Sequence, residues 1–339
     1  MILKINKWTA HHNQILYSLQ YYADLNKINF QIEYDAHLPN PGMLFKVNNK
    51  TCFLDYSDEV KFLSDPIQYD YYFKRSLLPD LITDKIHPLN FQVNISYRPL
   101  KLIFKMPIQI FKSKKSIIEF ARAIDYFGLI TNDSHPSKDL KKFSNLSFKN
   151  QTGRIIFMTR LWDPARSKEP EEKERRIKQN FFRINACRII SKNFPNSITG
   201  IFPDTFAKEV AGDVLLDLKL TTKKNYLFEL QRADIGIADD GLKDTPGWKI
   251  GEYIFMKKAI ISTPIQTVVE EFDDGKNYIS TDDRTNYKCL PDLISDLVKN
   301  KKYIELKRNN EAWFNKYMRP DKYIDNIINL TSNQFSIDS

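Results

Sequence analysis

One short segment of the chain contains residue types suited to binding a phosphate-containing ligand. An apolar run over residues 233–238 is followed by a polar loop and then by Gly-Trp-Lys-Ile-Gly-Glu-Tyr over residues 247–253. Four of the chain's ten glycines lie within residues 236–251. Thr245 and Pro246 are typical of an N-cap and a first helical position. We therefore predict a strand, a loop and a helix whose free first-turn amides, with Lys249, bind phosphate.

Two carboxylates accompany this predicted helix start. Glu252 lies about one turn into the helix, where a carboxylate can accept hydrogen bonds from ribose hydroxyls. Asp244 lies eight residues earlier, in the loop, nearer to a sugar than to a nucleoside. The alternative is that these are turn and cap residues with no ligand.

The segment resembles the donor-binding domain of GT-B glycosyltransferases. Asp244-x7-Glu252 is similar to the E-x7-E motif of many retaining members, with Asp in place of the first Glu, which leaves retention or inversion open. The resemblance implies that Glu252 holds the nucleotide ribose and that Asp244 approaches the transferred sugar. It is carried by residues 220–280 and extends over 151–330. The remaining implied donor-binding residues of the segment are Asp240, Gly241, Thr245, Gly247, Trp248 and Lys249.

A second candidate site is Arg-Leu-Trp-Asp-Pro-Ala-Arg over residues 160–166, directly after an apolar run. The resemblance implies that a basic side chain here binds the donor diphosphate; Arg160 matches best, followed by Arg166 and Arg183. A guanidinium suits a leaving diphosphate because it stays charged and is planar. The glycines of the family's loop are absent here. Two interpretations of Trp162 stay open from the sequence: its side chain stacks on a ring of the ligand, or it packs in the protein core.

The first half of the chain offers candidates for a general base. Asp55 and Asp58 follow a predicted strand, where a carboxylate can deprotonate an acceptor hydroxyl. Loop capping is the alternative interpretation. His11 and His12 are further candidates for the base or for an exposed cap pair, and the residues 72–75 for an anion or acceptor site.

Residues 101–115 combine five lysines with seven large apolar residues. Basic and apolar residues interleaved in this way suit an anionic membrane interface, and a lipid-linked acceptor would give such a contact a purpose. The alternative is a partly buried strand with lysines that extend to solvent.

The elements that must position these residues follow from hydrophobic periodicity. In the second half, strands alternate with helices of ten or more residues, which predicts right-handed βαβ units and a parallel sheet. We predict strands at 154–159, 198–202, 234–238, 259–263 and 278–280, and helices at 171–193, 221–232, 247–257, 291–300, 302–317 and 321–330. The first half reads as mixed α/β, with strands at 2–5, 30–34, 52–54, 69–73 and 91–95 and helices at 13–25 and 116–126.

The resemblance then implies two Rossmann-like domains facing across a cleft, as in the GT-B architecture. The predicted organisation is an acceptor-binding domain over 1–150, a nucleotide-sugar-binding domain over 151–320, and a helix within 321–339 that crosses back to the first domain. The polar residues 131–150 form the expected interdomain region.

Composition excludes several other classes. With 339 residues, 42 % apolar and 27 % charged, the chain is an ordinary globular protein, and 51 basic against 42 acidic residues give a net charge of +9 that favours anionic partners. Three widely spaced cysteines form no CxxC pair, and no P-loop or GxGxxG fingerprint is present. No Asp-x-Asp motif and no histidine cluster occurs, so we expect no metal and no other cofactor. No signal peptide or transmembrane run is visible, so we expect a cytoplasmic protein, peripheral at the inner face of the membrane.

The sequence therefore predicts a metal-independent glycosyltransferase that moves a sugar from a nucleotide sugar to a glycan or lipid-linked glycan in surface polysaccharide biosynthesis. One alternative is a nucleotide-sugar epimerase on the same fold. Another is a basic nucleic-acid-binding protein, which the spread of charge over both halves and the lack of any nucleic-acid motif disfavour.

Overall fold

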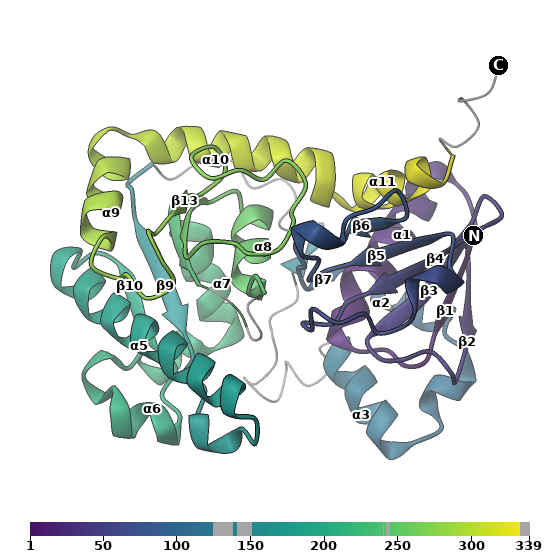
Figure 1. Ribbon diagram of the computed structural model, residues 1–339, viewed down its shortest axis with the longest axis horizontal. Coiled ribbons are helices and arrows are strands. Elements are labelled where there is room, and N and C mark those ends of the chain that lie inside the picture. Colours follow the sequence, from purple (N-terminus) through teal and green to yellow (C-terminus); the bar gives the residue numbers. More distant parts are fainter. Residues whose placement is uncertain (125–137, 141–150, 240, 242–244, 333–339) are drawn as a thin grey trace. The chain divides into compact units, whose positions relative to one another are not determined.

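The computed structural model describes residues 1–124, 138–140, 151–239, 241 and 245–332. The chain divides into two compact units (Figure 1). The first lies within Met1–Asn145, Thr267–Glu270 and Trp313–Ser339, and the second within Leu146–Gln266 and Glu271–Ala312. The domain boundaries expected from the sequence were at 150 and 320, and the two units change over after residues 145 and 312.

A six-stranded mixed sheet forms the centre of the first unit. β1 pairs with β2 in parallel, as do β4 with β5 and β5 with β6, whereas β3 is antiparallel to both of its neighbours. The strands, in their order across the sheet, are β2 (Gln31–Tyr34), β1 (Ile2–Ile5), β3 (Gly42–Val47), β4 (Lys50–Asp55), β5 (Tyr71–Lys74) and β6 (Ile86–Pro88).

β3, which makes this sheet mixed, was not predicted from the sequence. β3 and β4 form a hairpin whose two turn residues, Asn48 and Asn49, have φ of 51° and 58°. Two consecutive positive φ values define the type I′ turn that matches the twist of a hairpin, and asparagine tolerates this conformation well. The Asn-Asn pair between two apolar runs was therefore the feature of the sequence that could have predicted this hairpin and its strand β3.

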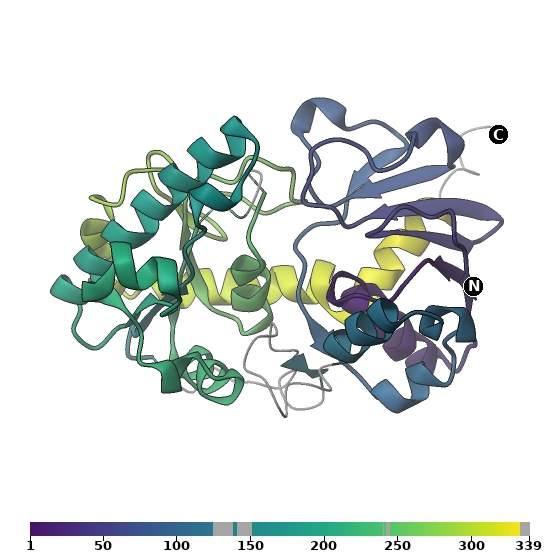
Figure 2. The same cartoon turned by 90° about the horizontal axis from the view of Figure 1, so that it is seen from below.

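Helices α1 (Asn13–Asn26) and α11 (Pro320–Ser332) lie side by side on the first unit, although about 300 residues separate them in the sequence (Figures 1 and 2). α11 begins one residue before the segment 321–339, in which the sequence predicted a helix that returns to the first domain. Further elements of this unit are β7 (Ile95–Ser96), α2 (Pro99–Ile103), α3 (Lys114–Ala123), β8 (Lys138–Asp139) and several 3₁₀ turns, among them Ile108–Phe111.

The strand predicted at 91–95 is wrong except at its last residue. In the buried stretch before β7, two backbone groups bond to a side chain of α1 instead of to a neighbouring strand. The Gln14 amide accepts a hydrogen bond from the Val93 N–H at 3.1 Å and donates to the Phe91 carbonyl at 3.3 Å. Asn13 donates to the Asn94 side chain at 2.7 Å.

The second unit contains a fully parallel five-stranded sheet, as predicted, so the α/β fold class is confirmed for both units. The strands, in their order across the sheet, are β10 (Ile198–Ile201), β9 (Ile155–Thr159), β11 (Ile235–Ala238), β12 (Ala259–Ser262) and β13 (Ile279–Ser280). Apolar side chains of β9, β11 and β12 pack against α5 (Pro170–Asn193) and α9 (Leu290–Lys299) to form the core. The other helices are α6 (Thr205–Val210), α7 (Lys223–Arg232), α8 (Trp248–Phe255) and α10 (Lys302–Trp313).

Two helix ends differ from the predictions. α8 begins at Trp248 with Gly247 as its N-cap, so Thr245 and Pro246 precede the cap instead of forming it. The helix predicted over 302–317 ends at Trp313, and Phe314–Met318 form a π-helical turn before α11. Single π-helical turns often lie at functional positions.

Candidate functional site

The carboxyl ends of three neighbouring strands bring polar residues to one edge of the second sheet. Thr159 ends β9, Asp239 follows β11, and Thr263 follows β12; all three are buried. Because β9, β11 and β12 are adjacent and parallel, these residues lie along the same edge. In open α/β sheets this edge is where ligands bind.

One face of α5 binds the loops that leave this edge. Arg175, Gln179 and Arg183 are spaced four residues apart and therefore lie on one side of the helix. Arg175 Nη1 and Gln179 Nε2 donate to the Gly241 carbonyl at 3.0 and 3.2 Å. Arg183 Nε forms a buried ion pair with Asp239 Oδ2 at 2.6 Å, and its Nη1 donates to the Arg160 carbonyl at 2.6 Å.

Lys249, in the first turn of α8, adds a further cation to this edge. Its Nζ donates to Thr159 Oγ1 at 3.0 Å and lies 5.6 Å from the centroid of the Phe157 ring. Desolvation lowers the pKa of Lys249 to about 8, against the opposing attraction of the Asp239 carboxylate. An amine that is poorly solvated when charged gains free energy from an arriving anion, because the anion stabilises its proton.

A small cavity of about 50 Å³ lies beside these residues. Its lining combines cations and amide or hydroxyl groups with one carboxylate: Arg175, Lys178, Gln179, Phe182, Asp239, Gly241, Thr263 and Arg284. Of these residues, only Gly241 was predicted from the sequence. The spacing of Arg175, Gln179 and Arg183 on the long helix was the signal for the basic face, but only the fold shows that it lies at the sheet edge.

Glu252 lies on α8, only 4 % exposed. The Tyr226 hydroxyl of α7 donates to its Oε2, and burial raises the pKa of Tyr226 well above its usual value. Glu252 therefore has a hydrogen-bonding partner inside the protein, and its role toward a ribose stays a prediction.

The other predicted donor-binding residues lie around the start of α8. Thr245 is buried, and its carbonyl accepts from the Gly241 N–H. A side chain at Gly241 would place its Cβ 2.7 Å from that carbonyl oxygen, so glycine is required by the tight turn. Gly247 and Trp248 are half-buried at the helix start. Asp240 and Asp244 lie outside the described residues.

The arginines predicted after β9 are both exposed. The Arg160 guanidinium lies 4.2 Å from the centroid of the Phe202 ring, and Arg166 pairs with Asp163 at 3.4 Å. Trp162 is half-buried, and both its backbone N–H and its carbonyl bond to the Asn180 side chain. The donor role of Arg160 and Arg166 stays a prediction.

Asp55, a predicted base in the first unit, is fully buried. It accepts hydrogen bonds from Tyr72 Oη at 2.7 Å, Lys74 Nζ at 3.0 Å and Ser57 Oγ at 2.6 Å, as well as from the backbone of Ser57 and Leu63. Burial lowers the pKa of Lys74, and Asp55 opposes that shift. This network gives Asp55 a structural role whether or not it also acts in catalysis.

Asp58 is more accessible, with 30 % of its side chain exposed, and it forms an ion pair with buried Arg75. His12 is buried, and burial lowers its pKa to about 3. Of the first-unit candidates, Asp58 thus offers a carboxylate near solvent.

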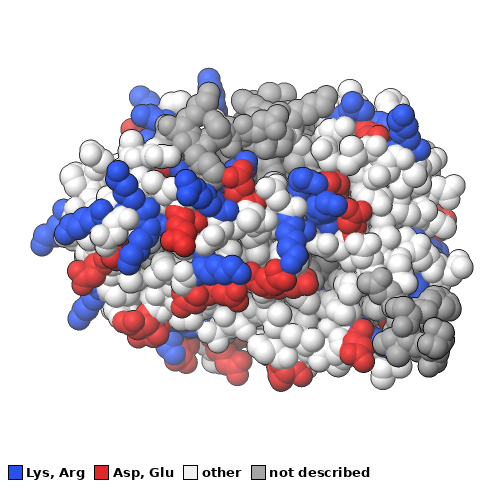
Figure 3. Space-filling view, turned by 90° about the horizontal axis from the view of Figure 1, so that it is seen from above, with Lys and Arg blue, Asp and Glu red and all other residues white. Residues whose placement is uncertain are grey.

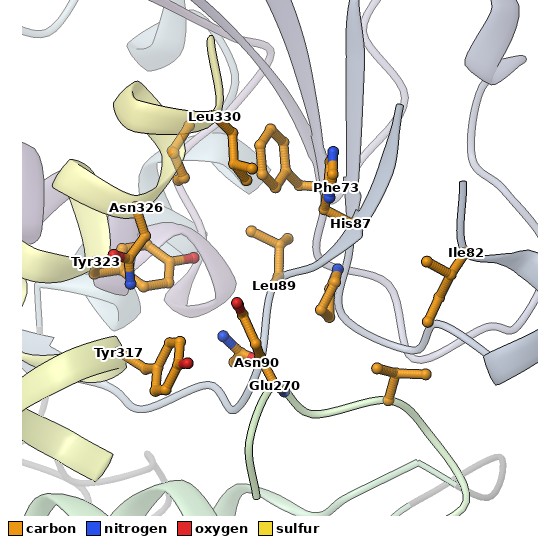
Figure 4. A pocket seen from close by; sticks show the side chains of 13 residues that line it. Phe73, Ile82, His87, Leu89, Asn90, Glu270, Tyr317, Tyr323, Asn326 and Leu330 are labelled. Carbon is orange, nitrogen blue, oxygen red and sulfur yellow. The ribbon is translucent and has the colours of Figure 1, made fainter. Parts of the chain in front are cut away.

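The first unit also contains a cavity of about 240 Å³ that no pattern in the sequence predicted. Figure 4 shows Tyr323, Asn326 and Leu330 of α11 on one side and Phe73 and His87 on the other. Its lining is mostly apolar and also includes the amide, imidazole and carboxylate groups of Asn90, Asn326, His87 and Glu270. No three His, Cys, Asp or Glu side chains come together as a potential metal site anywhere in the described part of the chain.

No protein-family model and no curated protein sequence matches the chain. Among solved structures, WaaG, a glycosyltransferase involved in lipopolysaccharide biosynthesis, matches over 96 % of this chain and 97 % of its own, at 11 % identity and a TM-score of 0.38. A glycosyltransferase from Rickettsia africae matches over 96 % and 82 %, at 12 % identity and a TM-score of 0.40. The C-terminal domain of LpcC, a group 1 family glycosyl transferase from Francisella tularensis, matches over 58 % and 93 %, at 15 % identity and a TM-score of 0.29.

All three of these solved proteins are described as glycosyl transferases. Because the three TM-scores are below 0.5, the fold assignment rests on the sheet topology of this chain, and the function is argued from its site.

Proposed function

We propose that this protein is a GT-B-type glycosyltransferase that moves a sugar from a nucleotide-sugar donor to a glycan or lipid-linked glycan acceptor in surface polysaccharide biosynthesis. The observation that carries the proposal is the group of cations at the carboxyl edge of the second sheet, where Lys249 and Arg183 accompany the start of α8. A nucleoside diphosphate is the ligand whose charge such a group matches.

The chemistry of transfer explains why cations are needed there. The bond between the anomeric carbon and the β-phosphate oxygen breaks, so negative charge grows on the leaving diphosphate. Fixed cations and helix amides stabilise this charge more in the transition state than in the bound donor, which accelerates the reaction. The acceptor hydroxyl forms the new bond to the anomeric carbon and loses its proton, to a carboxylate if the configuration inverts or to the departing phosphate oxygen if it is retained.

Roles for the remaining residues follow from the resemblance. Glu252 binds the ribose, Asp244 approaches the sugar, and Arg160, with Arg166 as a reserve, completes the diphosphate site, together with Asp240, Gly241, Thr245, Gly247 and Trp248. Asp58 or Asp55 serves as the base if the configuration inverts. We propose that the reaction needs no metal, so activity is expected to survive EDTA. We place the enzyme in the cytoplasm, in peripheral contact with the inner face of the membrane.

Binding of nucleoside diphosphates tests the donor site. We expect UDP, GDP, CDP or ADP to raise the melting temperature, and Lys249→Met to weaken binding of the active nucleotide about tenfold to a hundredfold, as for a lost charged hydrogen bond. The matched control is Lys208→Met, an exposed lysine on α6, which should bind as the wild type does. No response to any nucleotide would contradict the proposal.

The pH dependence of binding gives a second readout on Lys249. Because its pKa is about 8 in the free protein and an anion raises it, affinity should be highest below pH 8 and fall above it. This decline should disappear in Lys249→Met. An equal decline in the variant would assign the titration to another group.

Product analysis separates transfer from epimerisation. Transfer predicts that the matching nucleotide sugar releases its nucleoside diphosphate, faster when a glycan or lipid-linked acceptor is added. A change of sugar configuration with the nucleotide still attached would instead identify an epimerase.

A further inference from the structure

A row of large apolar side chains projects from the first unit into solvent. Leu100, Phe104 and Ile108 are 70 %, 88 % and 75 % exposed and are spaced four residues apart along α2 and the turns that follow it. Leu102 and Met106 of the same segment are buried. The segment thus has one side in the core and another that presents apolar groups to water, which marks an interaction surface.

The charged residues that neighbour this row along the chain are all positive. No Asp or Glu occurs in residues 85–118, which contain seven Lys and Arg. Arg98 and Lys101 form ion pairs with Asp24 at 2.8 and 2.5 Å, and Lys105 donates to the Asn29 side chain at 2.7 Å. The further lysines Lys112, Lys114 and Lys115 are exposed at the start of α3. An anionic partner therefore complements the surface.

We propose that Leu100, Phe104 and Ile108 insert into the interface of an anionic lipid bilayer while Lys112, Lys114 and Lys115 bind its headgroups. The three side chains are 70–88 % exposed and line neither of the two cavities described above, which suits a fluid, deformable partner. The lysines are single charges on flexible stems, which suits headgroups without fixed positions. A nucleic acid would use the cations but would gain little from three aliphatic and aromatic side chains in a row.

This contact differs from a membrane span. No helix within the described residues is long and apolar enough to cross a bilayer. The surface refines the broader expectation for residues 101–115, because these residues form helical turns and not the alternative strand. It is tested separately from the proposed glycosyl transfer, because vesicle binding is measured without any sugar.

Sedimentation with vesicles tests the proposal. The full chain should bind vesicles of equal parts phosphatidylglycerol and phosphatidylcholine and bind pure phosphatidylcholine weakly. Phe104→Ser with Ile108→Ser should reduce binding to the anionic vesicles at least about tenfold. The matched control is Ile67→Ser, because Ile67 is 89 % exposed on the same unit but lies between Asp65 and Asp70; it should leave binding unchanged.

The charge contribution is measured with Lys112→Ala, Lys114→Ala and Lys115→Ala combined. At the strength typical of lysine near an anionic surface, binding should fall about a hundredfold, and high salt should weaken the wild type in the same direction. Nucleotide-induced stabilisation, or an unchanged far-ultraviolet spectrum, verifies that each variant is folded.

Insertion itself has a spectroscopic signature. In Phe104→Trp, the added indole should shift its emission to shorter wavelength on anionic vesicles and be quenched by brominated lipid chains. The proposal is overturned if the serine variants bind vesicles as the wild type does, if Ile67→Ser loses as much binding, or if single-stranded RNA binds in a way that depends on the lysines and not on Phe104.

Discussion

At the scale of single residues, Asp55 was predicted to be a general base, and the structure places it in a buried hydrogen-bonding network that stabilises the fold. Each of its oxygens accepts from a hydroxyl or ammonium group, and its partner Lys74 is fully buried with it. Breaking such a pair on one side leaves an uncompensated buried charge, which costs more than the pair contributes.

We therefore expect Asp55→Asn to lower the free energy of unfolding by about 3 kcal/mol in denaturant titrations, with Asp55→Asn/Lys74→Met less affected because no charge is left unpaired. Asp70→Asn, at a half-exposed pair with Lys50, should cost about 1 kcal/mol or less. An Asp55→Asn variant as stable as the wild type but inactive in transfer would instead make Asp55 the base.

At the scale of elements, the contact between β11 and α8 positions the candidate donor site. Tyr253 of α8 packs directly over Gly236 of β11, and its hydroxyl donates to the Ile237 carbonyl at 3.0 Å. A Cβ at position 236 would lie 2.5 Å from the Tyr253 ring. The glycine lets the helix approach the strand closely enough for Lys249 to reach Thr159.

Gly236→Ala should therefore destabilise the protein by about 1–3 kcal/mol, as overpacking does, and weaken nucleoside diphosphate binding together with stability. Gly212→Ala is the matched control, since a Cβ at position 212 would meet no other atom within 4 Å. Thermal melting with and without nucleotide measures both effects. Unchanged melting in Gly236→Ala would show that α8 can shift without consequence.

The elements also show where hydrophobic periodicity was sufficient to predict secondary structure from the sequence. Apart from the short helix α6, which was not predicted, the strands and helices of the second unit were predicted within a few residues, because buried parallel strands are continuous apolar runs and most of the helices are long. The stretch before β7 was misread as a strand because its burial depends on Asn13 and Gln14, whose hydrogen bonds arise only in the folded unit.

At the scale of the whole molecule, the net charge is +9, and both signs of charge occur on the face shown in Figure 3. The molecule also contains a set of buried bases whose charged forms are disfavoured. Desolvation lowers the pKa of Lys258 to about 7 and that of His12 to about 3.

These shifts predict stability that rises with pH. Between pH 7 and 10.5 the unfolded chain holds a proton on Lys258 that the folded chain releases, so raising the pH favours folding, and His12 acts in the same direction between pH 3 and 6.5. The free energy of unfolding should therefore increase from pH 7 to pH 9. Lys258→Met should reduce that increase, of which Lys249, with a pKa of about 8, supplies a further part above pH 8. Lys299→Met, on the exposed side of α9, should leave the increase unchanged. A wild type equally stable at both pH values would contradict this assignment.

The sequence by itself determined the α/β class, the parallel sheet of the second unit, and the segment 233–263 as the place to look for a ligand, because periodicity and glycine placement are local properties of the chain. Only the tertiary structure brought Arg175 and Arg183 to the loops that follow β9 and β11, buried Asp55 and Glu252 among their hydrogen-bonding partners, and left Phe104 projecting into water. These outcomes depend on which distant segments pack together, and burial and electrostatic environment are properties of that packing.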